Sequence, residues 1–246
     1  MFRMLLFLLF VVGGGCGRPE DRVVVFAAAS VADVMERLGE RYESETGRRV
    51  EVHSAASSML AQQIARGARV DVVILANTEW MDWLAERGLI DAGSRRDLLS
   101  NSLVVVTPKS ESLQIDFAGG PEQLGRKIAM GDPSHVPVGR YAEQALRRLG
   151  WWEDVEPNIV PAVDARAALR YVELGEVDSG IVYATDAMMS GRVEIAAEIP
   201  PVFHEPIVYP VSAGLDSGDS GELFLEYIST EPAGELFRDA GFVVIR

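Results

Sequence analysis

Four predicted junctions between a strand and the following helix carry residues that can donate hydrogen bonds towards one point. Serine stands at two of them, Ser30 and Ser57, and small or apolar residues begin the helices near Val138 and Ala165. Tyr183 ends a further buried strand, and its phenol can also donate. The first N–H groups of a helix lack partners within it and lie at its positive end, so they favour anions. Such donors would hold an anion without using a cation.

Two features of these junctions allow another interpretation. Serine is a preferred helix N-cap, so Ser30 and Ser57 taken singly could be structural caps. Asp164 and Asp186 flank two of the junctions, which is adverse for an anion. We expect Asp164 to cap its own helix and thereby leave the first amide free.

The sequence contains no persuasive catalytic or metal-binding pattern. Residues 218–221 read Gly-Asp-Ser-Gly, the tetrapeptide around the nucleophile of trypsin-like proteases, but they lie in a polar loop where Ser220 would cap the next helix. His53, His135 and His204 lack metal-ligand spacing. We therefore expect no catalytic residue, no direct metal-cation ligand and no cofactor. A secreted hydrolase that uses Ser30 or Ser57 remains a distant alternative.

The charge balance is acidic. Formal net charge is −14, from 23 basic and 37 acidic residues, and 48% of the 246 residues are hydrophobic. An acidic chain is a poor partner for nucleic acid. It can still hold a buried anion, because such a site depends on local amides.

The N-terminus predicts export. Arg3 precedes an apolar run at 4–12 that is too short for a permanent membrane span. Glycines then lead to Cys16, the only cysteine, in a setting similar to a bacterial lipoprotein cleavage box. We expect residues 1–16 to be a signal peptide that ends at a lipidated Cys16, with an ordinary secretory signal as the alternative. A chain with one cysteine forms no internal disulfide.

Apolar runs and helix-spaced patterns alternate along the chain, which predicts an α/β fold. Because the pattern restarts after residue 102, we expect two lobes, each with a mainly parallel sheet flanked by helices. Lobe one would comprise 21–99 plus 208–246, and lobe two 101–204, with a hinge near Asn101 and Ile207. The ligand would lie in the interlobe cleft, beyond the carboxyl ends of the strands. Expected strands are 23–27, 49–53, 71–75, 103–107, 127–130, 159–162, 180–183, 207–212 and 242–245.

Several segments in this order resemble the periplasmic molybdate-binding proteins of ABC importers. The segments are VFAAAS, SSMLAQQIARGARVDVVILAN, EWMDWL, NSLVVV, GDPSHVPVGRYAEQALRRLGWW, DARAAL and GIVYATDA. The resemblance runs from about residue 23 to the C-terminal GFVVIR. It implies the two-lobed periplasmic-binding-protein fold of type II, and a protein that binds and delivers a ligand instead of catalysing a reaction.

The resemblance also implies a ligand set. By position, the family's oxyanion ligands fall on Ser30, Ser57, Val138, Ala165 and Tyr183. It implies that the serines donate hydroxyl and amide hydrogens, that Val138 and Ala165 donate backbone amides, and that Tyr183 donates its hydroxyl. Val138 replaces a smaller residue and Ala165 a valine, which leaves backbone bonding unchanged but alters the volume of the cavity.

A site made only of hydrogen-bond donors favours ligands that carry no proton. Molybdate, tungstate and sulfate are tetrahedral dianions that only accept hydrogen bonds, whereas hydrogenphosphate carries a proton that would face other donors. An unpaired buried polar group costs roughly 1–3 kcal/mol, about one to two decades in affinity. Molybdate, with tungstate, is the ligand that the resemblance implies, and sulfate or another oxyanion is the alternative.

The implied partners follow from that role. We expect an extracytoplasmic monomer, held at the membrane through lipidated Cys16, that closes over the oxyanion and delivers it to an ABC transporter permease. His135 and Arg140 lie near the proposed cleft mouth, and we expect both to be bystanders at its rim.

Overall fold

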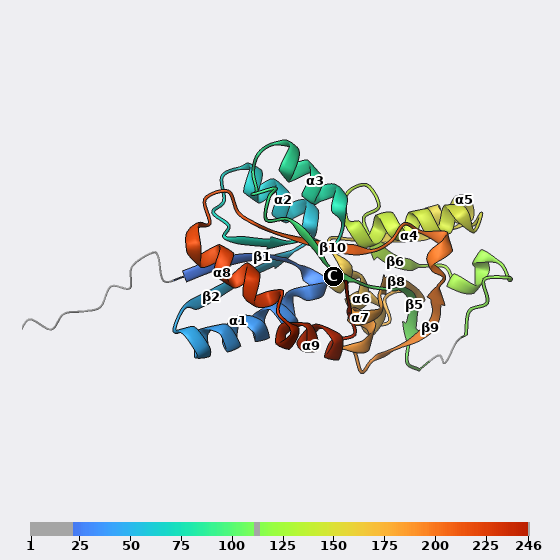
Figure 1. Ribbon diagram of the computed structural model, residues 1–246. Coiled ribbons are helices and arrows are strands. Elements are labelled where there is room, and N and C mark those ends of the chain that lie inside the picture. The colour runs from blue at the N-terminus through green and yellow to red at the C-terminus, as the bar shows by residue number, and fades with distance from the viewer. Residues whose placement is uncertain (1–21, 111–113, 246) are drawn as a thin grey trace, which may run out of the picture.

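Two lobes, each built around one β-sheet, make up the molecule in the computed structural model (Figure 1). The structure describes residues 22–110 and 114–245. The predicted signal peptide at 1–16 and the lipid attachment at Cys16 lie outside these residues. Within the described ranges, no helix has the length and apolar character needed to cross a membrane.

The first sheet is six-stranded, and helices cover both of its faces. Its strand order is β11-β4-β10-β3-β1-β2, with bounds β1 Arg22–Ala28, β2 Arg49–Ala55, β3 Val72–Ile74, β4 Arg96–Ser100, β10 Val208–Ala213 and β11 Val243–Val244. Its helices are α1 Ala32–Thr46, α2 Ser57–Ala65, α3 Thr78–Glu86, α8 Gly218–Ile228 and α9 Glu231–Asp239. In β1, Val23 and Val25 pack in one cluster with residues of α1, α8 and α9, while Val24 and Phe26 pack in another with α2 and α3. Burial on both faces explains why this strand is a continuous apolar run.

The second sheet is five-stranded and follows the same plan. Its strand order is β7-β6-β8-β5-β9, with bounds β5 Leu103–Pro108, β6 Ile128–Gly131, β7 Ile159–Ala162, β8 Ser179–Tyr183 and β9 Val193–Ile199. Its helices are α4 Pro137–Arg148, α5 Trp152–Val155, α6 Ala165–Glu173 and α7 Ala184–Met188. Val105 packs in one cluster with α4, and Val104 and Val106 pack in another with α6. Short 3-10 turns complete the chain: η2 Ala29–Val31, η3 Pro121–Leu124, η4 Glu156–Asn158 and η5 Pro201–Phe203.

The α/β class with two helix-flanked sheets is confirmed, but the expectation of mainly parallel sheets is wrong. β1 pairs in parallel with β2 and β3, whereas β10 pairs antiparallel with both β3 and β4. In the second sheet, β6 is parallel to β7 and β8, whereas β5 is antiparallel to β8 and β9. The antiparallel strands β5 and β10 are the ones that the chain enters from the other sheet, without the helical crossover that parallel neighbours need.

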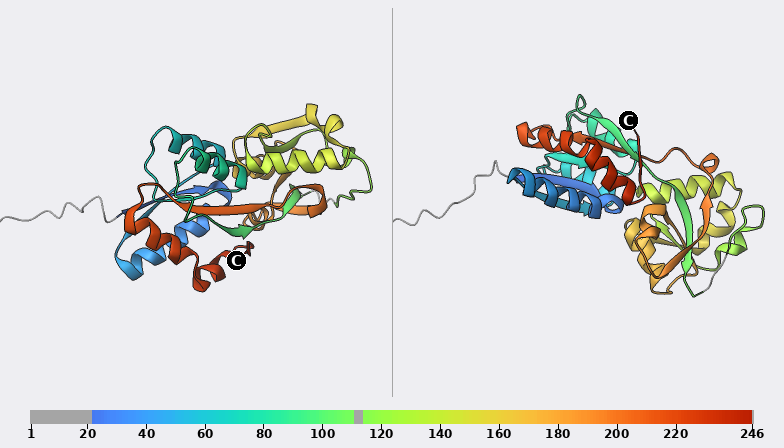
Figure 2. Two further views of the ribbon diagram at one scale, coloured as in Figure 1. Left: turned by 45° about the horizontal axis from the view of Figure 1, so that its top comes forward. Right: turned by 60° about the horizontal axis from the view of Figure 1, so that its bottom comes forward.

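The chain passes between the sheets twice, once from β4 to β5 and once from β9 to β10 (Figure 2). The sequence pattern predicted no strand at β4 or β9. β4 reads Arg-Asp-Leu-Leu-Ser, which resembles a polar linker more than a strand. In β9 the register with β5 shifts at Val105 and Val106, and its buried residues recur every third position instead of every second.

Close packing of two glycines joins β6 to α4. A Cβ built on Gly139 would lie 2.0 Å from the carbonyl oxygen of Gly131, so only glycine allows the helix to begin this close to the strand end. This contact sets the position of the first turn of α4 against the sheet.

We predict that Gly139→Ala destabilises the protein even though alanine favours helix by about 1 kcal/mol. The backbone clash should outweigh that gain and lower the free energy of unfolding by about 1–3 kcal/mol. Urea unfolding measures the change. Gly191→Ala is the control, because a Cβ there meets nothing within 4 Å. A Gly139→Ala variant as stable as the native chain would contradict the prediction.

Candidate functional site

A cavity lies between the lobes, lined by residues at or just after the carboxyl ends of β1, β2, β3, β7 and β8 and by the start of α4. Its empty volume, open solvent included, is about 220 Å³. All five predicted ligand residues line it: Ser30, Ser57, Val138, Ala165 and Tyr183. Alanines at 28, 29, 56 and 76 form much of the remaining wall. The small side chains leave the helix starts open to the space between the lobes.

Ser30 lies in η2, the single 3-10 turn that separates β1 from α1, and its side chain is buried. The interpretation of Ser30 as a helix cap is wrong, because α1 begins at Ala32 and its N-cap is Val31. The hydroxyl is instead hydrogen-bonded to the hydroxyl of Tyr209, with the oxygens 2.8 Å apart. The extra turn therefore moves the serine out of the capping position.

Ser57 is the first residue of α2, and Ala56 occupies the N-cap position. Its Oγ accepts a hydrogen bond from the backbone N–H of Ala76 at 2.9 Å. The capping interpretation is therefore wrong here as well. Because an amide N–H can only donate, the Ser57 hydroxyl keeps its own hydrogen for another acceptor.

Two further helices begin at the cavity. Val138 is the second residue of α4, after Pro137, whose missing N–H suits the first helical position. Ala165 is the first residue of α6. Asp164 is the N-cap of α6 and accepts from the Ala167 amide at 2.8 Å, so the predicted cap is confirmed. Since that cap bonds the third amide of the helix, it leaves the Ala165 amide for a ligand.

Tyr183 ends β8, and its hydroxyl is a buried polar atom without a hydrogen-bond partner. Burial, more than any neighbouring charge, raises the pKa of Tyr183 well above its ordinary value, so the phenol stays protonated at neutral pH. Leaving such a donor unpaired costs roughly 1–3 kcal/mol. A ligand oxygen in the cavity would supply the missing acceptor.

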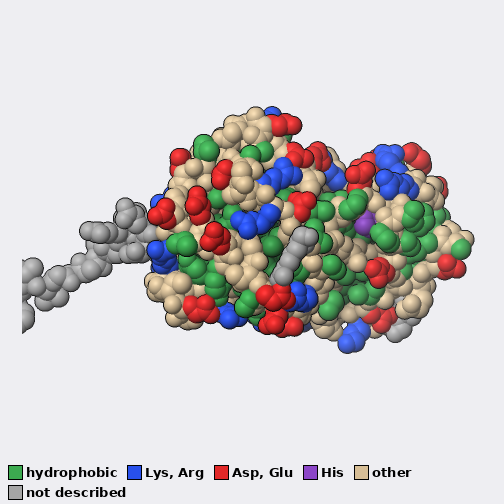
Figure 3. Space-filling model, viewed as in Figure 1, with side chains coloured by type: hydrophobic (Ala, Val, Ile, Leu, Met, Phe, Trp, Pro, Cys, Tyr) green, Lys and Arg blue, Asp and Glu red, His purple; other side chains and the backbone are tan. Residues whose placement is uncertain are grey.

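No lysine, arginine or histidine is among the described residues that line the cavity. On the face shown in Figure 3, acidic and basic side chains are interspersed over both lobes. Arg166 of α6 pairs with buried Asp186 and, across the gap between the lobes, with Asp33 of α1 at 2.9 Å. The cavity therefore offers an anion neutral donors, and the one carboxylate among its described lining residues, Asp164, accepts from the Ala167 amide. Arg166, next to Ala165 in the chain, is engaged by carboxylates.

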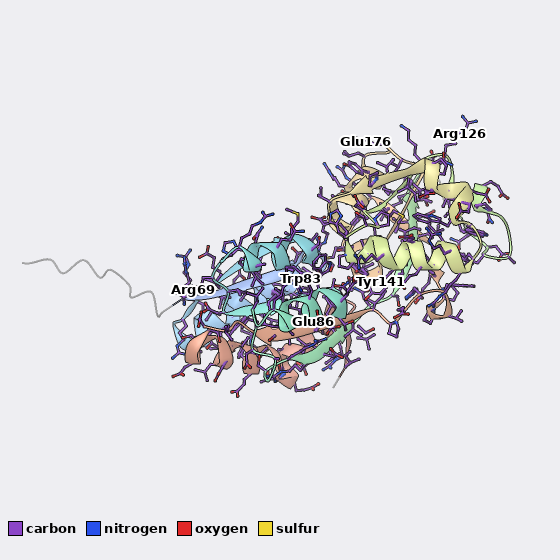
Figure 4. The ribbon with its side chains drawn as sticks, turned by 90° about the horizontal axis from the view of Figure 1, so that it is seen from above. Arg69, Trp83, Glu86, Arg126, Tyr141 and Glu176 are labelled. Atoms are coloured by element: carbon purple, nitrogen blue, oxygen red, sulfur yellow. The ribbon has the colours of Figure 1, made fainter. Side chains whose placement is uncertain are left out.

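A second set of contacts links the lobes through α3 and the start of α4 (Figure 4). Trp80 Nε1 donates to the carbonyl of His135 at 3.0 Å, and Arg140 forms an ion pair with Glu79. Neither His135 nor Arg140 is in the cavity lining. The bond of Trp80 across the lobes could not be predicted, because an aromatic residue on an amphipathic helix has the same sequence pattern when it only packs.

No catalytic or metal-binding site is found among the described residues that the sequence offered for such roles. Ser220 lies inside α8 and is not in the cavity lining, and its predicted role as a cap is wrong because α8 begins at Gly218 after Ser217. The described residues contain no group of three histidine, cysteine, aspartate or glutamate side chains able to hold a metal ion. The Ser30 and Ser57 hydroxyls bond to the Tyr209 hydroxyl and to the Ala76 amide, and neither partner is an imidazole, an amine or a carboxylate.

Comparison with known proteins agrees with this geometry. The family model for bacterial extracellular solute-binding proteins matches residues 23–243. The molybdate-binding protein ModA of Escherichia coli is 38% identical over 244 residues, 96% of this chain and 95% of that protein. A putative ABC transporter substrate-binding lipoprotein of Bacillus subtilis, YvgL, is 34% identical over 95% of this chain and 94% of its own length.

The fold has solved counterparts. The periplasmic molybdate-binding protein of Azotobacter vinelandii superposes with a TM-score of 0.79 over 91% of this chain and 100% of that one, at 23% identity. The two-lobed α/β architecture with a cavity between the lobes is one that this solved protein shares. This chain belongs to the bacterial extracellular solute-binding protein family.

We predict a pH-dependent contribution to stability from Asp186. Burial raises its pKa to about 6 against an ordinary value of 3.8, although Arg166 opposes the shift. The folded state thus binds the proton more tightly than the unfolded state, and the stability due to this group is lost as pH rises from about 4 through about 6. A shift of this size corresponds to about 3 kcal/mol.

The substitution Asp186→Asn removes the titrating carboxyl and with it the loss of stability at rising pH. Between pH 4 and pH 7, its free energy of unfolding should therefore rise relative to the native chain by up to about 3 kcal/mol. Urea titrations at successive pH values measure the difference. Asp154→Asn, at an exposed position, serves as the control. A difference between Asp186→Asn and the native chain that does not change with pH would contradict the prediction.

Proposed function

We propose that this protein captures molybdate, and also tungstate, outside the cytoplasmic membrane and delivers it to an ABC transporter permease. The observation that carries the proposal is the cavity itself, where hydroxyls and helix-start amides converge and one buried phenol lacks a partner. The 38% identity to a molybdate-binding protein over nearly the whole chain supports the choice of ligand.

The five lining residues have complementary roles in this proposal. The hydroxyls of Ser30, Ser57 and Tyr183 donate to ligand oxygens, and the backbone amides of Val138 and Ala165 donate from the first turns of α4 and α6. The dipoles of these helices favour a dianion at the same place. Removal of water strengthens each bond when the lobes close.

Lobe closure is the mechanical part of the proposal. The lobes would comprise 21–99 plus 208–246 and 101–204, and would turn about the crossing segments near Asn101 and Ile207. The contacts of Trp80 with His135 and of Arg166 with Asp33 join the two lobes. They would stabilise the closed arrangement, and opening at the permease would break them.

Location and assembly complete the proposal. The protein acts as a monomer and is anchored to the membrane through a lipid on Cys16, which the export pattern at the N-terminus favours. Similarity to a substrate-binding lipoprotein along almost the full chain supports this anchoring. Metabolic labelling with a fatty acid, with and without Cys16→Ser, tests it.

Calorimetric titration of the mature protein with molybdate, tungstate, sulfate and phosphate tests the ligand. We expect molybdate and tungstate to bind tightly, and phosphate to bind at least one to two decades more weakly because its proton meets only donors. Sulfate binding as tight as that of molybdate would replace the proposed ligand with a broader class of tetrahedral oxyanions.

We expect Tyr183→Phe to weaken molybdate binding about tenfold, equivalent to about 1.4 kcal/mol. The ligand-free variant should be at least as stable as the native chain, because the hydroxyl it removes is buried and unpaired. Calorimetry and thermal unfolding measure the two effects.

Tyr227→Phe is the matched control for this variant. The Tyr227 hydroxyl is also a buried atom without a partner, but it lies on α8, away from the cavity. Its removal should leave molybdate affinity unchanged. An unchanged affinity in Tyr183→Phe would exclude the Tyr183 hydroxyl from the site.

A further inference from the structure

A chain of hydrogen bonds leads from the crossing between the lobes to the Ser30 hydroxyl. Asn101 lies between β4 and β5, and its Nδ2 donates to Thr185 Oγ1 at 2.9 Å and to the Tyr209 hydroxyl at 3.2 Å. Tyr209, in β10, has no solvent exposure, and its hydroxyl lies 2.8 Å from Ser30 Oγ. Neither Asn101 nor Tyr209 lines the cavity, so an effect on a ligand must pass through a lining residue that Tyr209 contacts. Ser30 is bonded to its hydroxyl, and Tyr183 packs against its ring at 5.8 Å between centroids.

The partners of the Asn101 side chain determine the direction of its hydrogen bonds. Asn101 Oδ1 accepts from the Ser102 backbone N–H at 2.9 Å, which places oxygen on that side of the amide and nitrogen on the other. The amide nitrogen can only donate, and its two hydrogens match its two acceptors. The oxygen of Tyr209 thus accepts from Asn101, and its single phenol hydrogen is available for Ser30 Oγ. Either hydroxyl of the Tyr209–Ser30 pair can be the donor, and we take Tyr209 as the donor.

These bonds determine where the hydrogen of the Ser30 hydroxyl can point. If Ser30 Oγ accepts from Tyr209, its own hydrogen must point to a different acceptor. Ser57 is in the same state, because its Oγ accepts from the Ala76 amide. In this arrangement each serine hydroxyl keeps a hydrogen for an acceptor in the cavity, Ser57 because of the backbone amide of Ala76 and Ser30 because of the side chains of Tyr209 and Asn101.

We infer that Asn101 and Tyr209 are positioning residues that hold the Ser30 hydroxyl as a hydrogen donor to the bound oxyanion, and that they thereby select against anions that carry a proton. This inference rests on the proposed function. Without the phenol of Tyr209, the Ser30 hydroxyl could rotate and accept from a protonated oxyanion. Selectivity, and not affinity alone, would then change.

The test is a double-mutant cycle on Tyr209→Phe and Ser30→Ala, with molybdate and inorganic phosphate as ligands. Tyr209→Phe should weaken molybdate binding about tenfold and leave phosphate binding unchanged or tighter, so that the ratio of the two affinities falls by at least tenfold. In the Ser30→Ala background, the same substitution should change molybdate affinity less than twofold, because the hydroxyl that it orients is absent.

Two further variants keep the result interpretable. Tyr171→Phe, on α6 and outside the cavity lining, is the control and should leave both affinities unchanged. Asn101→Ala removes the donor to Tyr209 and should shift the ratio in the same direction, which provides a reading if Tyr209→Phe does not fold. Thermal unfolding is recorded for every variant.

The outcomes separate this inference from the proposed function. Equal weakening of molybdate and phosphate, or an effect of Tyr209→Phe that is as large without the Ser30 hydroxyl as with it, would show a purely structural role and overturn the inference alone. A native protein that binds none of these oxyanions would overturn the proposed function, and the inference with it.

Discussion

A buried anion without a buried cation must be satisfied by hydrogen-bond donors, and this requirement governs the architecture around the cavity. The start of a helix supplies such donors from the backbone. Helices α2, α4 and α6 all begin there, α2 and α6 with at most two residues between them and the preceding strand, and α4 after a short turn. The alanines of the wall and the contact of Gly131 with Gly139 let these starts approach the cavity closely.

The same requirement explains where charge is placed. Arg166 would be the obvious partner for an anion, but Asp186 and Asp33 engage it. A free guanidinium would bind a dianion strongly and would also attract other anions without regard to their protons or shape. Neutral donors in fixed directions give selectivity that depends on the hydrogen-bonding pattern of the ligand.

Much of this arrangement could be predicted from the sequence, because it depends on local patterns. The apolar run at β1 and the small residues before each helix predicted the α/β class and the positions of the candidate donors. Asp164 was predicted as a cap because capping involves only residues three apart. The serine caps were wrong because a single 3-10 turn at Ser30, or a shift of one residue at Ser57, changes the partner of a hydroxyl.

Contacts between residues far apart in the sequence could not be predicted from local patterns. Tyr209 and Ser30 are 179 positions apart. The sequence pattern of an apolar strand that contains a tyrosine is the same whether or not the tyrosine hydroxyl makes a hydrogen bond. The antiparallel placement of β5 and β10 was also missed, because strand direction depends on the route of the chain between the sheets. The hydrogen bond from Trp80 to His135 was missed for the same reason, because it joins residues 55 positions apart that lie in different lobes.

The position of β10 between β3 and β4 has a consequence for how the chain is made. The second sheet is built from one continuous stretch, 103–199, whereas the first needs β10 and β11 from the end of the sequence. Until residues 208–213 have been synthesised, β3 keeps an unpaired edge and the first lobe cannot close its core. Domains generally fold as units, with N-terminal ones first during synthesis. Here the lobe that contains β1 would finish last, after the second lobe, because β10 must be available to pair with β3.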